Sequence, residues 1–109
     1  MTDAVVRISK GSFDPKNYDE IHRLSLEAAK ILTPAITPLR GLIYYHASVD
    51  PITNTFVHVS VWTDLEAAEQ MGSLAAMQAQ RLILEKAGVT FERIANYGPL
   101  WKIEGEIGL

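Results

Sequence analysis

The chain has 109 residues, a length that fits one domain, and 48 % of them are hydrophobic, a share too high for intrinsic disorder. The formal net charge is −3 and the Lys and Arg residues are scattered, so a nucleic-acid partner is not expected. The lack of cysteine excludes disulfides and thiolate chemistry, and no apolar run is long enough to span a membrane. We therefore expect one domain over residues 1–109, cytoplasmic and not bound to a membrane.

The first third of the chain predicts a strand and then a helix. Residues 4–9 alternate in the manner of a strand. Asn17 is the expected N-cap of the helix, with Glu20 completing a capping box. Pro34 and Pro38 are expected to stop the helix, because proline supplies no backbone N–H. The buried stripe of this helix is predicted to comprise Ile21, Leu24, Ala28, Ile31 and Leu32.

The middle of the chain predicts a β-hairpin. Residues 39–50 and 55–64 both read as strands, and the Pro and Asn between them predict the turn. Thr63 and Glu66 form another capping-box pattern, so a helix should begin directly after the second of these strands.

The last part of the chain predicts an interrupted helix and a final strand. Gly72 should break the helix, and Ser73 can cap its second part. Gly88 stands where a helix favours a left-handed residue at its end. A strand is predicted over 89–103, with an interruption near Gly98.

The order strand, helix, strand, strand, helix, strand predicts the βαββαβ pattern of a ferredoxin-like α+β domain. Such a domain has a four-stranded antiparallel sheet with its helices on one face. The other face has no cover from its own chain, so we expect a homodimer formed through it.

The strand over 55–62 decides which side chains lie on that open face. Its valines at 57, 59 and 61 alternate with rings and polar groups, and we expect the valines to pack on the helices. Large rings on the open face would form an apolar patch, which a dimer would cover while enclosing a pocket. The predicted pocket residues are Arg7, Tyr44, His46, His58, Ser60 and Trp62.

His58 is the candidate catalytic residue, because an imidazole titrates near neutral pH and can act as a general base. Trp62 can stack on a flat aromatic ligand, with Ser60 beside it. The alternatives are a histidine that is only hydrogen-bonded by Tyr44 or a carbonyl, and a tryptophan that belongs to the core or to the dimer interface.

The other pocket candidates have binding roles. Tyr44 and Arg7 can bind a ligand oxygen, although Arg7 can equally pair with a surface carboxylate. His46 and His58 could together ligate a metal, but the sequence offers no evident third ligand. We therefore expect no metal and no cofactor.

The stretch GLIYYHASVDPITNTFVHVSVWTDLEAAEQ resembles the antibiotic biosynthesis monooxygenase-like family of the dimeric α/β-barrel superfamily. The matching features are a glycine opening the strand, a turn with Asp and Pro, a strand ending in Trp and a capped helix. In this chain they are Gly41, Asp50, Pro51, Trp62 and the segment 63–66.

The resemblance implies a dimeric α/β barrel and, in members that oxidise aromatic phenols, the use of O2 without metal or flavin. Trp62 occupies the position that lines the substrate cavity in those members, and His58 replaces their usual Asn. Haem-degrading relatives have a histidine on the following helix, which EAAEQMGSLAAM lacks. The expected function is a cofactor-independent monooxygenase or related enzyme for a small aromatic or enolisable molecule. The alternative is a non-catalytic ligand-binding or structural homodimer.

Overall fold

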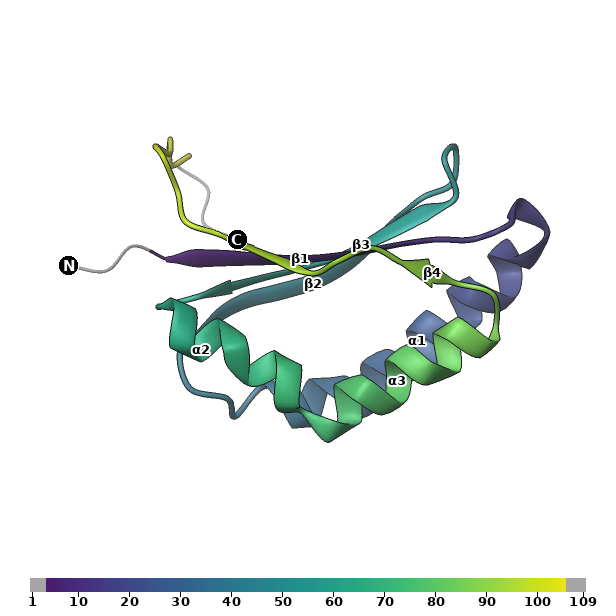
Figure 1. Cartoon of the computed structure of the whole chain (residues 1–109), viewed down its shortest axis with the longest axis horizontal. Coiled ribbons are helices and arrows are strands. Elements are labelled where there is room, and N and C mark those ends of the chain that lie inside the picture. The colour runs from purple at the N-terminus through teal and green to yellow at the C-terminus, as the bar shows by residue number, and fades with distance from the viewer. Residues whose placement is uncertain (1–3, 106–109) are drawn as a thin grey trace.

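The computed structural model describes residues 4–105, which form one β-sheet lying over a layer of helices (Figure 1). The strand order is β2-β3-β1-β4, and all pairs are antiparallel. This arrangement confirms the predicted ferredoxin-like α+β class. The elements are β1 (Val5–Ser12), the 3-10 helix η1 (Pro15–Asn17), α1 (Tyr18–Ile36), β2 (Leu42–Asp50), β3 (Thr55–Trp62), α2 (Leu65–Glu69), the 3-10 helix η2 (Gln70–Ser73), α3 (Ala75–Lys86), β4 (Thr90–Phe91) and β5 (Ala95–Tyr97).

Helix α1 continues through Pro34 and ends at Ile36, so Pro34 does not stop the helix as expected, while Pro38 lies two residues beyond its end. A proline inside a helix removes one backbone hydrogen bond. Ile36, beyond the proline, is buried in the core, and this packing favours continuing the helix. Ile31 was expected in the buried stripe and is instead half exposed.

The predicted assignment of the sheet faces is also wrong. Trp62 is completely buried against Leu32 and Ile36 of α1, and Phe56 is buried with Ile21 of α1 and Leu84 of α3. His58 and Ser60 alternate in step with these two rings, so they too face the helices. The physical reason is size: an indole and a phenyl ring remove more apolar surface from water than valines do.

The valines of β3 therefore lie on the open face of the sheet. The register pairs Val61 with Val6 and Val59 with Ile8 of β1, which extends this aliphatic surface onto the neighbouring strand. The valines are only partly buried, because no element among residues 4–105 covers them. The part of the open face formed by β1 and β3 is thus aliphatic, whereas an aromatic and polar surface was expected.

A bulge between Leu42 and Tyr44 determines which side chains of β2 face the helices and which face the open side. Leu42 pairs with Trp62 and Tyr45 pairs with Ser60, so both face the helices. Tyr44 and His46 pair with valines of β3 and lie on the open face. The six predicted pocket residues are therefore divided between the two faces. Arg7, His58, Ser60 and Trp62 lie on the helix side, and Tyr44 and His46 lie on the open side.

Several element ends differ from the sequence expectation. Asp64, not Thr63, caps α2, and its Oδ1 accepts a hydrogen bond of 2.8 Å from the Ala67 N–H. Leu74 rather than Ser73 precedes α3. Gly88 has the expected left-handed backbone, with φ of 107°. The last strand is split into the short β4 and β5, and both pair with β1.

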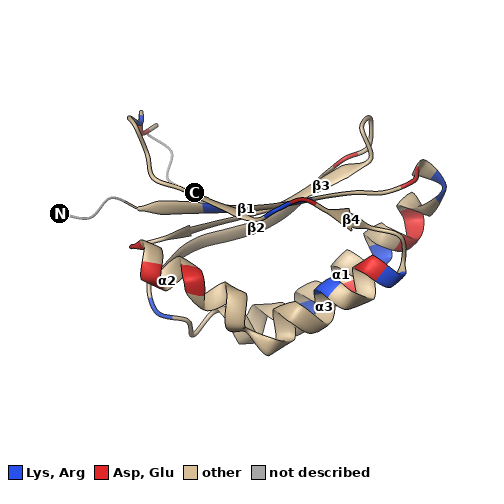
Figure 2. Ribbon diagram, viewed as in Figure 1, with Lys and Arg blue, Asp and Glu red and all other residues tan. Residues whose placement is uncertain are grey.

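Figure 2 shows acidic and basic residues interspersed along the helices. Within residues 4–105, no helix has the length and apolar character needed to cross a membrane.

Because Trp62 fills the centre of the core, Trp62→Ala should lower the free energy of unfolding by about 3–5 kcal/mol, as for other buried aromatic truncations. Trp101→Ala is the matched control, since that indole is 77 % exposed and should be replaceable with little effect. Urea denaturation of both variants measures the difference. Equal stabilities would contradict the burial of Trp62.

Candidate active site

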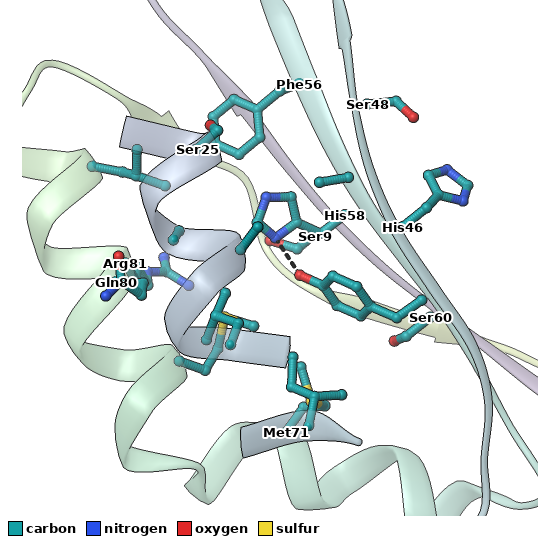
Figure 3. A pocket seen from close by; sticks show the side chains of 18 of the residues that line it. Ser9, Ser25, His46, Ser48, Phe56, His58, Ser60, Met71, Gln80 and Arg81 are labelled. Atoms are coloured by element: carbon teal, nitrogen blue, oxygen red, sulfur yellow. Dashed lines mark hydrogen bonds between the residues drawn. The ribbon is translucent and has the colours of Figure 1, made fainter. Parts of the chain in front are cut away.

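A cavity of about 730 Å³ lies between the helix face of the sheet and helices α1 and α3 (Figure 3). This volume lies in the range of small-molecule sites, which are apolar clefts with a few convergent polar groups. The floor is formed by β1, β2 and β3, and the opposite wall includes Ala28 and Leu32 of α1 and Leu84 of α3. A cavity is therefore present on the helix face of the sheet, whereas the pocket was predicted on the open face.

The central polar feature is a hydrogen-bonded pair on the cavity floor. Tyr45 Oη and His58 Nδ1 are 2.8 Å apart, and this contact is the dashed line in Figure 3. The two residues come from adjacent strands and their rings meet edge to face. With Nδ1 occupied by Tyr45, the other ring nitrogen, Nε2, is left for a ligand.

Burial controls the protonation of this pair. It lowers the pKa of His58 from 6.5 to about 4, with a smaller contribution from repulsion by His46. It raises the pKa of the Tyr45 hydroxyl. At neutral pH the site therefore contains a neutral imidazole and a neutral phenol. The imidazole can accept a proton, but its cation is stable only if an anion forms beside it.

Aromatic rings surround the pair on one side. The ring of Phe56 is 5.2 Å from that of His58 and 5.6 Å from that of Phe91. Arg81 of α3 lies over Phe91, with its Cζ 4.7 Å from the ring centroid. A flat ligand in this part of the cavity would meet ring edges and a delocalised cation.

Trp62 does not line the cavity. Its indole is enclosed by the core, and its Nε1–H donates a hydrogen bond of 2.8 Å to Ser60 Oγ. Ser60, by contrast, does line the cavity beside Arg7. Trp62 therefore contributes to the site by holding Ser60, and because its ring is fully buried it offers no surface on which the expected ligand could stack.

Arg7 lies on the cavity floor two positions along β1 from Ser9, which is the register partner of His58. Its Nη1 donates a hydrogen bond of 3.2 Å to Asn96 Oδ1 on β5. Burial lowers the pKa of Arg7, and attraction by Glu69 partly opposes this shift. Arginine stays protonated at physiological pH, so Arg7 places a partly buried positive charge in the cavity.

Tyr44 and His46 border the cavity from the edge strand β2, where their side chains hydrogen-bond to each other. Figure 3 shows His46 pointing away from His58. The two imidazoles therefore do not converge on one point. Among the residues that the structure describes, no cluster of three or more His, Asp or Glu side chains could hold a metal ion.

The sequence pattern missed several cavity residues. Tyr45 lies on the helix side of the sheet, and its contact with His58 could not be foreseen because the sequence pattern places His58 on the other face. Gln80, which is 7 % exposed, lines the cavity from α3. Its position four residues before Leu84 on one helix face was the available signal, since a polar residue on a buried stripe needs a polar environment.

No family model matches the chain, and no curated protein matches it. Solved structures do. SnoaB from Streptomyces nogalater, described as a cofactor-independent oxygenase, has 15 % sequence identity and a TM-score of 0.67, over 95 % of this chain and 100 % of SnoaB. A protein from Deinococcus radiodurans, described as a candidate antibiotic biosynthesis monooxygenase, has 21 % identity and a TM-score of 0.70, over 93 % and 99 % of the two chains.

A conserved protein from Methanosarcina mazei matches at a TM-score of 0.68 and 15 % identity, over 89 % of this chain and 93 % of that one. At these identities the similarity establishes the fold. The resemblance seen in the sequence is therefore confirmed at that level: the chain has the fold of the antibiotic biosynthesis monooxygenase-like proteins. One fold can host many chemistries, so function must be argued from the cavity.

The low pKa of His58 makes stability depend on pH. The unfolded chain binds a proton at this residue below pH 6.5, and the folded chain only near pH 4, so stability should fall as pH decreases through this interval. Between about pH 7 and about pH 4.5 the loss due to His58 should be roughly 2–3 kcal/mol. Urea unfolding of the wild type and His58→Asn at both values tests this. Identical losses would contradict a buried neutral imidazole.

Proposed function

We propose that the protein is a cofactor-independent oxygenase that acts on a small electron-rich aromatic or enolisable molecule bound between the sheet and the helices. The observation that carries this proposal is the pair formed by His58 and Tyr45 at 2.8 Å in a largely apolar cavity. Structures described as oxygenases with the same fold support the kind of chemistry.

The first step assigned to the site is proton transfer. If Nδ1–H of His58 donates to Tyr45 Oη, then Nε2 is free to accept a proton and the tyrosine hydroxyl is free to donate to a ligand oxygen. A phenol or an enolisable C–H that loses its proton to Nε2 becomes an anion. This anion and the new imidazolium stabilise each other in the apolar cavity, which offsets the cost of charging a buried histidine.

The electrons for oxygen reduction come from the substrate. The carbanion form passes electrons to O2, a C–O bond forms, and the resulting hydroperoxide anion takes the proton from His58. Loss of water from the hydroperoxide of a CH2 carbon leaves a carbonyl group, so one oxygen atom enters the product and the other leaves as water. The protein supplies a base, a hydrogen-bond donor and a largely apolar site that orients the substrate.

A non-catalytic ligand-binding protein is the second candidate. The observation that favours it is the low pKa of His58, about 4, because an imidazole with that pKa is a weak base in the absence of a ligand anion. A ligand-binding protein would bind phenols in the same cavity without consuming oxygen.

We expect His58→Ala to reduce oxygen consumption with a responsive phenol by about two to four orders of magnitude, the usual effect of losing a general base. Tyr45→Phe should have a smaller effect, since it keeps the imidazole and removes one hydrogen bond. An oxygen electrode and a panel of phenols and naphthols provide the measurement, and circular dichroism checks that both variants fold. An active His58→Ala variant, or a panel that consumes no oxygen, would refute the oxygenase proposal.

We also propose that two chains pair through the open sheet face. The partly exposed aliphatic side chains of β1 and β3 support this proposal, because a surface of this kind is normally covered. Two sheets packed face to face about a two-fold axis would cover it on both copies at once.

Val59→Lys places a charge at the middle of this face, where Val59 pairs with Ile8 and His46. We expect the variant to sediment as a monomer while the wild type sediments as a dimer, because a buried unpaired ammonium opposes association. Ile52→Lys, in the exposed β2–β3 turn, is the matched control and should leave the dimer intact. A wild type that stays monomeric at high concentration would contradict the proposal.

A further inference from the structure

The charges around the cavity have one sign. Among the described residues that line it, the formally charged side chains are Arg7 and Arg81, and no Asp, Glu or Lys lines it. His58 is neutral because its pKa is lowered to about 4. The whole chain has a net charge of −3, so this positive interior is a local property of the cavity. A low-dielectric cleft lined by one sign of charge favours ligands of the opposite sign.

Arg7 and Arg81 are placed differently with respect to His58. Arg7 is paired in register with Ser60, and Ser9 is paired with His58. Arg7 therefore lies two residues before the register partner of His58 in β1. This offset corresponds to about 7 Å along the strand. Arg81 lies on the other side of His58, beside Phe91, whose register partner is Gly11. His58 therefore lies between two cationic ends of the cavity.

The charge of Arg81 is already engaged. Its guanidinium lies over Phe91, and its Nε is 3.7 Å from Glu85 Oε1 in an ion pair between partly exposed side chains. Arg7 differs, because its hydrogen bond goes to the neutral amide of Asn96. Glu69 attracts Arg7 electrostatically without forming an ion pair with it among the residues described. Arg7 is therefore the cation with most of its charge available to a ligand.

Arg7 lines the cavity together with Ser60 on the neighbouring strand and Gly72 in η2. A Cβ added to Gly72 would lie 3.9 Å from Arg7 Nη2, in ordinary van der Waals contact, so the glycine does not displace the guanidinium from the cavity wall. A planar carboxylate matches a guanidinium fork in shape and charge and can accept two N–H hydrogen bonds from it.

From these observations we infer that the ligand is a hydroxy-aromatic carboxylate, with its carboxylate bound by Arg7 and its phenolic or enolic oxygen at the pair of His58 and Tyr45. This inference rests on the proposed function, because it uses the same cavity and the same pair. It adds the substrate class: an aromatic acid in which a carboxylate and an ionisable hydroxyl lie at opposite ends of a flat ring system.

The test compares 6-hydroxy-2-naphthoate with its methyl ester, which has the same ring and hydroxyl but no charge. Binding is followed by the fluorescence of the naphthol under anaerobic conditions, so that turnover plays no part. The wild type should bind the acid at least about tenfold more tightly than the ester, the effect of one charge-assisted interaction. Arg7→Gln should abolish this preference, and Arg7→Lys should retain part of it.

Arg23→Gln is the control for loss of one positive charge, because Arg23 is paired with Glu20 on the exposed side of α1. It should keep the full preference for the acid. Thermal unfolding of each variant verifies that the cavity is intact. The inference is overturned if the ester binds as tightly as the acid, if neither probe binds, or if a folded Arg7→Gln variant keeps the preference.

The two proposals fail separately. Preference for the acid combined with no oxygen consumption across the phenol panel would refute the oxygenase and leave the ligand class standing. Oxygen consumption combined with preference for the ester would refute the ligand class and leave the oxygenase standing.

Discussion

The burial of Trp62 is the constraint on which the rest of the structure depends. Side chains of a strand alternate between faces, so placing this indole among α1 and α2 commits Ser60, His58 and Phe56 to the same side. The intervening valines must then lie on the opposite side. One strand therefore supplies the polar groups of the cavity and the centre of the open aliphatic face, and a shift of its register by one residue would exchange the side chains of both faces.

The cavity combines two electrostatic features. His58 and Tyr45 are kept neutral by burial, while the arginines at either side remain charged. A bound acid can therefore transfer its proton to a group inside the cavity. The anion that remains would lie between the two positively charged arginines. This arrangement suits a ligand that becomes more negative as it reacts.

The sequence predicted the order of elements well because local signals mark it. Gly88 requires a left-handed backbone, and the Pro and Asn after β2 define a turn, whatever the rest of the chain does. The sequence could not decide which face of β3 is internal, because Val59 and Trp62 are both apolar. Alternation separates the two faces of a strand but does not show which of them is buried. The deciding quantity was the area each face could bury against α1, which is a tertiary property. The course of α1 past Pro34 was missed for the same reason.

The irregularity in β2 has a consequence for the chemistry. Two tyrosines stand side by side at positions 44 and 45, and the extra residue at Ile43 determines that Tyr45 turns inward. In a regular ladder starting from the pairing of Leu42 with Trp62, Tyr44 would occupy the inward position and Tyr45 would face outward. The bulge in this edge strand thus selects which of two identical phenols is partnered with the imidazole, because the same residues in a regular ladder would place Tyr44 there instead.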